Sequence, residues 1–169
     1  GMVSCQTDVV EGLHVDANGE AELTLQVGLP EATRASGNDS ALGAIDNGLD
    51  LVDTYDVRFI LAVYDAGGNL AKRVEKFEDN ATSTGFTIRL VPGRDYTFVV
   101  WADFVNEGTE TALHYDASDL TDIKLTKNMG DNQPMDESRD AYTVKQPIEK
   151  FSAKDSNLNL TLTRPFAKL

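Results

Sequence analysis

Hydrophobic and polar side chains alternate in several short segments along this chain. In residues 21–29 the apolar side chains occupy every second position, at Leu23, Leu25, Val27 and Leu29. Three further segments alternate in the same way: 55–64, 86–90 and 158–162. Alternation with a period of two predicts half-buried β-strands. Because almost no segment shows helical spacing, we predict an all-β sandwich of about seven to eight short strands with long loops.

The most apolar stretch of the chain is LVPGRDYTFVVWADF, residues 90–104. Both faces of the strand expected here are largely apolar, which predicts a central strand that is covered on both sides. The stretch contains one acid, Asp103, and no histidine, so it lacks the paired titratable groups of a catalytic floor. We therefore expect a structural role, and the predicted structural core comprises Leu25, Tyr96, Phe98 and Trp101.

The remaining segments are predicted from their composition. Residues 1–19 are polar and indicate a tether, so the sandwich domain is expected over residues 20–169. Residues 30–53 are rich in Gly, Ser, Asn and Asp and predict a long loop, a kind of segment that is often functional or mobile. Residues 72–77 are charged and indicate an edge strand, because lysines discourage edge-to-edge pairing.

The charge balance limits the partners of the protein. The chain of 169 residues carries 15 Lys plus Arg against 28 Asp plus Glu, a formal net charge of −13. This excess of acids argues against nucleic acid and anionic membrane surfaces, because phosphate binding needs clustered cations. No run is long and apolar enough to span a bilayer, so we expect membrane contact only through a lipid anchor.

Cys5 is the single cysteine, so neither an internal disulfide nor a cysteine-based metal cluster is possible. It follows Met2-Val3-Ser4, and small residues before a cysteine near the start of a mature chain resemble a bacterial lipobox. This resemblance implies lipidation at Cys5. The alternative is an unmodified thiol in a flexible segment.

The sequence contains no nucleotide-binding, nucleophile-elbow or zinc-protease motif. The two histidines, His14 and His114, are far apart in sequence. Acidic residues gather in two places: Asp116, Asp119, Asp122; and Asp131, Asp136, Glu137, Asp140. We interpret the first group mainly as turn caps, with a Ca²⁺ or catalytic role as the alternative. We interpret the second group mainly as solvated surface, with weak Ca²⁺ binding as the alternative. We expect no enzymatic activity, no cofactor and no metal site.

Several motifs, in their order along the chain, resemble the N-terminal domain of the fimbrillin-like surface proteins of anaerobic gut and oral bacteria. Besides Cys5, they are EATRA at 31–35, PGRDYTFVVWADF at 92–104, HYD at 114–116, DL at 119–120, RDAY at 139–142 and LTRPFAKL at 162–169. The resemblance implies a transthyretin-like β-sandwich and secretion as a surface or outer-membrane lipoprotein. It also implies a fimbrial or adhesin role without enzymatic activity, with other fimbrial subunits or host and bacterial surface ligands as partners.

In the resembled family, cleavage at an arginine after the first strand lets that strand leave, and a neighbouring subunit fills the groove. The matching position here is the Arg34–Ala35 bond, and Arg34 is the only Lys or Arg before Val57. Family members usually carry a second β-domain, so this sequence corresponds either to one domain of a longer protein or to a single-domain relative. A carbohydrate-binding surface module is the alternative function, with these exposed aromatics as candidates: Tyr55, Tyr64, Trp101, Tyr115 and Tyr142.

Overall fold

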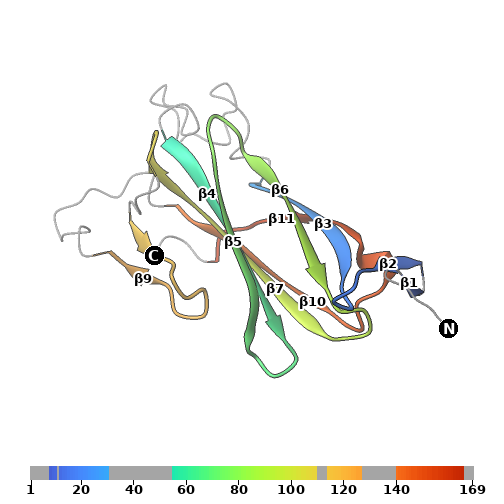
Figure 1. Ribbon diagram of the computed structural model, residues 1–169. Coiled ribbons are helices and arrows are strands. Elements are labelled where there is room, and N and C mark those ends of the chain that lie inside the picture. Colours follow the sequence, from blue (N-terminus) through green and yellow to red (C-terminus); the bar gives the residue numbers. More distant parts are fainter. Residues whose placement is uncertain (1–7, 11, 31–54, 110–113, 127–139, 166–169) are drawn as a thin grey trace.

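The computed structural model describes residues 8–10, 12–30, 55–109, 114–126 and 140–165. Within these residues the protein is almost entirely β-structure, with one short 3-10 helix, η3 (Ala153–Asp155). The main strands form two sheets that pack face to face (Figure 1). The prediction of an all-β sandwich is therefore confirmed.

The first sheet is built around β3 (Ala21–Gly28), which pairs on both of its edges. β6 (Ser83–Leu90) runs antiparallel to β3 along its whole length, from the pair Ala21 and Leu90 to the pair Gly28 and Ser83. β11 (Asn157–Thr161) pairs with the other edge in parallel, starting at Thr24. β3 is therefore an interior strand of the first sheet, with hydrogen-bonded neighbours on both edges.

The second sheet has the order β10-β7-β4-β5, and all of its strand pairs are antiparallel. Its strands are β4 (Tyr55–Asp65), β5 (Leu70–Glu78), β7 (Tyr96–Asn106) and β10 (Tyr142–Ile148). β7, the most apolar stretch of the sequence, lies inside the sheet between β4 and β10. β10 is an edge strand, and this position tolerates Pro147, which lacks a backbone N–H.

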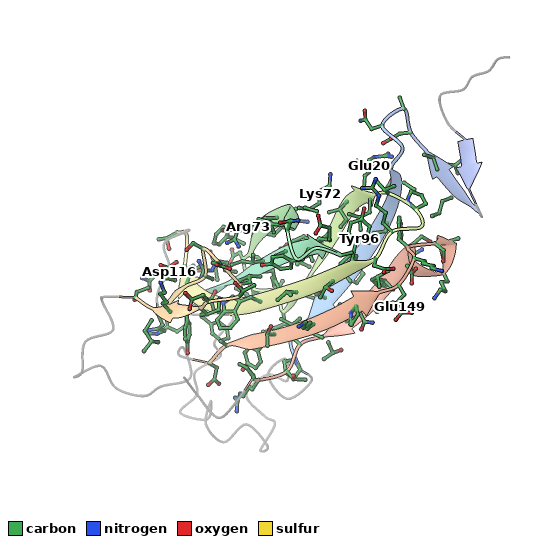
Figure 2. All side chains as sticks on the ribbon, turned by 90° about the horizontal axis from the view of Figure 1, so that it is seen from below. Glu20, Lys72, Arg73, Tyr96, Asp116 and Glu149 are labelled. Atoms are coloured by element: carbon green, nitrogen blue, oxygen red, sulfur yellow. The ribbon has the colours of Figure 1, made fainter. Side chains whose placement is uncertain are left out.

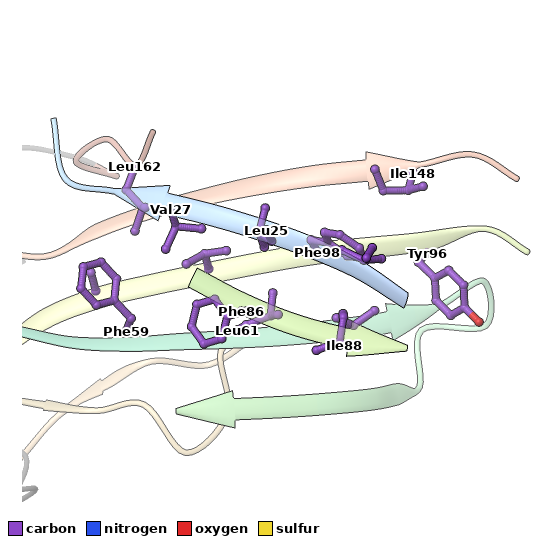
Figure 3. Close-up of a cluster of buried hydrophobic side chains, with 14 of the residues drawn as sticks. Leu25, Val27, Phe59, Leu61, Phe86, Ile88, Tyr96, Phe98, Ile148 and Leu162 are labelled. Atoms are coloured by element: carbon purple, nitrogen blue, oxygen red, sulfur yellow. The ribbon is translucent and has the colours of Figure 1, made fainter. Parts of the chain in front are cut away.

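The core lies between the two sheets (Figure 3). From the first sheet, β3 contributes a row in which Leu23, Leu25 and Val27 are at most 2% exposed. From the second sheet, Phe59 on β4 and Phe98 on β7 are fully buried. The alternation seen in the sequence therefore becomes the inner faces of a sandwich, and apolar burial is its main stabilising term.

A smaller apolar cluster covers the outer face of the second sheet. Ile60 and Trp101 on that face pack under Tyr115 and Ala117, with Ala141 beside them. The covering segment contains the hairpin of β8 (Tyr115–Asp116) and β9 (Lys124–Leu125), which projects beside the sandwich (Figure 1). This explains why both faces of β7 are apolar.

The N-terminal region differs from the predicted tether. β1 (Asp8–Val10) and β2 (Leu13–Val15) form an antiparallel hairpin, and β2 joins β3 through the pair Val15 and Ala21. Leu13 is only 5% exposed and belongs to the main core. The segments are too short to show an alternating pattern, so their apolar residues gave no strand signal in the sequence.

Candidate functional site

The strand β3 and the position it occupies form the first candidate functional site. Its neighbours β6 and β11 flank a groove one strand wide, and the inner face of the second sheet forms the floor of this groove. The side chains of Leu23, Leu25 and Val27 fill the groove, while Glu22 and Gln26 point outward and are exposed. Burial of each of the three apolar side chains is worth about 1.5–3 kcal/mol, so an empty groove would cost the protein much of its stability.

The described strands that precede β4, namely β1, β2 and β3, lie on the N-terminal side of the predicted cleavage site. The last of them, β3, ends at Gly28, and Arg34 follows six positions later. Leu29 is still fully buried, and its N–H donates to the carbonyl of Thr82 at 2.9 Å. Cys5, Arg34 and Ala35 themselves lie outside the described residues.

The four residues predicted as structural core occupy two different clusters. Leu25, Tyr96 and Phe98 are in the main core, where they are 0%, 6% and 0% exposed. The hydroxyl of Tyr96 also accepts a hydrogen bond from the N–H of Val91 at 3.0 Å. Trp101 is 4% exposed but belongs to the outer cluster, where its ring meets Tyr115 edge-on with 5.4 Å between centroids.

A buried ion pair lies beside this outer cluster. Arg58 of β4 donates to both carboxylate oxygens of Asp103 on β7, with N–O distances of 2.8 and 2.5 Å. The same guanidinium donates to the carbonyl of Tyr115 at 3.2 Å. Burial raises the pKa of Asp103 above its ordinary value, and the hydrogen bonds and charge of Arg58 oppose this rise. The pair therefore anchors the covering segment to the sheet.

No sequence pattern indicates this pair. The available signal was one arginine in the apolar strand 55–64 and one acid in the apolar stretch 90–104. Only the register of β4 against β7, which puts Arg58 directly opposite Asp103, shows that the two charges meet. Strand register depends on the whole sheet and cannot be read from either segment alone.

A hollow of about 500 Å³ opens above the ion pair. Its charged side chains include Arg58, Arg73, Glu75, Asp116 and Lys124. Arg73 donates to the carboxylate of Glu75 at 2.6 Å and to the carbonyl of Ala117 at 2.8 Å. The guanidinium groups that line this hollow thus already donate to acceptors of the protein itself. Figure 2 shows Arg73 and Asp116 toward the same end of the sheet.

The candidate sugar-stacking aromatics are mostly buried. Trp101, Tyr115 and Tyr142 are at most 4% exposed, so their faces are not open to a ligand. Tyr55 packs against Phe104 at the edge of the core, with 6.3 Å between ring centroids. Tyr64 is partly exposed and lines a hollow of about 450 Å³ with Asn69, Arg73 and Asp119.

The acidic residues singled out in the sequence have structural partners. Asp116 accepts from the N–H of Ser118, and Asp119 accepts from the N–H and the hydroxyl of Thr121. Asp140 is 2% exposed and accepts from Arg164 at 2.7 Å. Asp131, Asp136 and Glu137 lie outside the described residues.

The two histidines occupy separate elements. His14 is an exposed residue of β2, whereas His114 is buried next to Tyr115. β2 and the β8–β9 hairpin lie at opposite ends of the molecule (Figure 1). Among the described residues, no helix is long and apolar enough to cross a membrane.

Two solved structures resemble this fold. One is a DUF1812 protein from Bacteroides thetaiotaomicron, described as a candidate polysaccharide-binding protein. It is 16% identical in sequence with a TM-score of 0.45, and the match covers 85% of this chain and 47% of that protein. A fimbrial assembly protein from Parabacteroides distasonis is 12% identical with a TM-score of 0.39, covering 86% of this chain and 52% of its own. The chain therefore spans about half the length of these two proteins.

Sequence comparison is more specific about the family. No curated protein matches the chain. The family model described as "Family of unknown function (DUF6562)" matches residues 15–169, which include every described strand of both sheets from β3 onward. The chain belongs to this family.

Proposed function

We propose that the protein is a cell-surface fimbrial or adhesin subunit that assembles by strand exchange after cleavage near Arg34. The observation that carries the proposal is the position of β3, which is bonded on both edges and buries a full row of apolar side chains. Every described residue before Arg34 belongs to the N-terminal segment that one cut would separate from the rest. The fimbrillin-like motifs of the sequence support the same function.

The exchange has a simple physical basis. Loss of β3 exposes the edges of β6 and β11 together with the apolar floor between them. A donated strand with apolar residues at every second position restores both the hydrogen-bond ladders and the buried row. The segment before β3 is held by the burial of Leu13 and by partly exposed ion pairs, Arg89 with Asp16 and Lys72 with Glu20, which contribute little. The apolar row of β3 is therefore the main force that retains it.

Limited proteolysis with an arginine-specific protease tests the proposal. Mass spectrometry should identify cleavage after Arg34, and Arg34→Ala should abolish that product. After the N-terminal fragment is removed in mild denaturant, a labelled peptide of residues 20–30 should bind the remaining protein. The matched control is the same peptide with serine in place of Leu23, Leu25 and Val27, which should not bind.

The uncut protein supplies a second control, because β3 still occupies the groove between β6 and β11 and should exclude the peptide. Resistance of the Arg34–Ala35 bond in folded protein, while other arginines are cleaved, would contradict the processing step. Equal binding of the alternating peptide and the serine peptide would contradict the strand-exchange mechanism.

Attachment at the cell surface is proposed to use a lipid on Cys5. Acyl chains on a single residue hold a protein at a membrane through burial of their methylene groups, and several chains are needed for stable binding. Cys5→Ser in the native cell should move the protein from the membrane fraction to the soluble fraction. Unchanged membrane association of this variant would exclude Cys5 as the anchor.

Carbohydrate binding is the second candidate function, and the hollow beside Tyr64 favours it. This hollow combines a partly exposed aromatic ring with an amide, a guanidinium and a carboxylate, from Asn69, Arg73 and Asp119. Such a set can stack on a sugar ring and bond its hydroxyls. Glycan-array binding that disappears in Tyr64→Ala and persists in Tyr55→Ala would support this function. Binding that both variants retain would exclude this hollow.

A further inference from the structure

Three carboxylates meet at one end of the second sheet. Asp56 is the second residue of β4, Asp79 follows the last residue of β5, and Glu107 follows the last residue of β7. One carboxylate oxygen from each lies within 4.8 Å of one from each of the others. Because β4 lies between β5 and β7, the topology brings these three strand ends together.

The register explains how close the acids are. The last β4–β5 pair at this end joins Val57 to Glu78, and one further step places Asp79 opposite Asp56. On the other side Asp56 pairs with Val105, two positions before Glu107. Like charges directly opposite in a sheet are destabilising, so this arrangement calls for a counter-charge. Among the described residues, no lysine or arginine forms an ion pair with any of the three.

One oxygen of Asp56 is buried without a partner. Asp56 is 7% exposed, and its Oδ2 accepts from the N–H of Gly108 at 2.9 Å. Its Oδ1 is shielded from solvent and has no hydrogen-bond partner among the described residues. A buried unsatisfied carboxylate oxygen is costly, and in native proteins such an atom commonly marks a ligand or ion.

The donor set is typical of a hard cation. It offers only oxygen atoms, one from a buried side chain and two from exposed turns, with solvent access for water ligands. Calcium binds oxygen at about 2.3–2.6 Å, so two ligands of one ion stand up to about 5 Å apart, which matches the spacing here. Calcium also tolerates irregular geometry, whereas Mg²⁺ demands a near-ideal octahedron with shorter bonds.

We infer that Asp56, Asp79 and Glu107 form a Ca²⁺ site that joins the ends of β4, β5 and β7. Calcium neutralises the cross-strand repulsion and satisfies Asp56 Oδ1, while the N–H of Gly108 holds the other oxygen in place. Water molecules complete the coordination on the exposed side. Few protein ligands and an open site correspond to a dissociation constant of about 10⁻⁴–10⁻³ M, as in extracellular calcium modules.

Calorimetric titration with CaCl₂ at constant ionic strength, together with thermal unfolding in CaCl₂ and in chelator, tests the site. Wild-type protein should bind Ca²⁺, and its Tm should rise with calcium and return to the calcium-free value in chelator. Asp56→Asn should weaken binding at least tenfold and abolish the Tm shift. The matched control Glu149→Gln removes one charge at the opposite end of the sheet and should behave as wild type (Figure 2).

Asp79→Asn and Glu107→Gln provide exposed variants that do not alter a buried group, and each should weaken binding several-fold. If Asp56 only stabilised the fold, Asp56→Asn would have a lower Tm than wild type in the absence of calcium. Because the substitution relieves the repulsion among the three carboxylates, we expect its calcium-free Tm to equal or exceed that of wild type. No calcium-dependent change in wild type up to about 10 mM would overturn the site. Unchanged binding in all three variants, or equal affinity for Mg²⁺, would overturn it as well.

Discussion

Arg58 on β4 and Asp103 on β7 face each other at a directly paired position of two adjacent strands. Two hydrogen bonds join their side chains, and both residues are at most 6% exposed. The Arg58 guanidinium also reaches the carbonyl of Tyr115, which belongs to the segment that covers the sheet. A charged pair thus ties a separate segment to the most apolar strand of the protein.

Removal of one member of this pair should destabilise the fold strongly. Arg58→Met leaves Asp103 buried without a counter-charge, which typically costs about 3–5 kcal/mol. The double variant Arg58→Met/Asp103→Leu removes both charges and should recover most of that loss. Urea unfolding followed by circular dichroism measures all three proteins. A single variant within about 1 kcal/mol of wild type would show that the pair is not needed.

The deficit of Arg58→Met should depend on pH. Burial raises the pKa of Asp103 and Arg58 opposes the rise, so the variant has a folded-state pKa further above the unfolded value. The folded state then binds a proton that the unfolded state does not hold, and stability is lost as the pH rises through the folded pKa. Unfolding at pH 5 should therefore show a smaller deficit than at pH 7. A deficit independent of pH would contradict this.

Trp101 should contribute to stability through the outer cluster rather than the main core. Its ring is 4% exposed and contacts Tyr115 edge-on. Trp101→Ala should cost about 3–5 kcal/mol, the usual loss for a large buried aromatic side chain. Because Trp101 is the single tryptophan, the emission of the native protein reports its environment directly. An emission maximum typical of indole in water would contradict the packing.

Leu25 and Gln26 are adjacent residues of β3, and the first side chain is buried while the second is exposed. Alanine substitutions at the two positions therefore distinguish the effect of side-chain burial from that of a change elsewhere in the same strand. Leu25→Ala removes a fully buried side chain and should cost about 2–5 kcal/mol, whereas Gln26 is exposed and its replacement by alanine should change stability by about 0.5 kcal/mol at most. Denaturant unfolding compares the two variants. Similar losses in both would mean that the apolar row does not hold β3.

The fold was largely predictable because its strands alternate cleanly. The row of β3 and the two apolar faces of β7 follow from side-chain spacing alone, since only burial on one face or on both produces these patterns. The hairpin of β1 and β2 was not predictable, because segments of three residues carry no period. Leu13 is buried through its contact with the sandwich rather than through any local signal.

The candidate sites were less predictable because they depend on register. Asp56, Asp79 and Glu107 are separated by more than twenty residues along the chain and meet only when β4 lies between β5 and β7. The acidic clusters visible in the sequence were instead local. Asp116 and Asp119 each bond a backbone N–H two residues ahead, so spacing within one segment identified turns rather than a metal site.

Asp65 should make the stability of the protein sensitive to acid. At the turn between β4 and β5, its Oδ1 accepts from the N–H groups of Asn69 and Gly67, each at 2.9 Å. The hydrogen bond from Asn69 is the largest cause that lowers the pKa of Asp65, and Gly67 adds to it. Because the folded pKa lies below the unfolded value of about 3.9, the contribution of Asp65 to stability is complete above that value and is lost as the pH falls through the folded pKa.

Asp65→Asn keeps an acceptor oxygen but does not titrate. The stability of this variant should therefore fall less steeply than that of wild type between pH 5 and pH 2, about the window in which such carboxylates protonate. Urea unfolding across this range measures the difference, with Glu149→Gln as a variant that removes a carboxylate without changing this turn. If Asp65→Asn and Glu149→Gln lost stability in parallel with wild type, the turn would not be the acid-sensitive element.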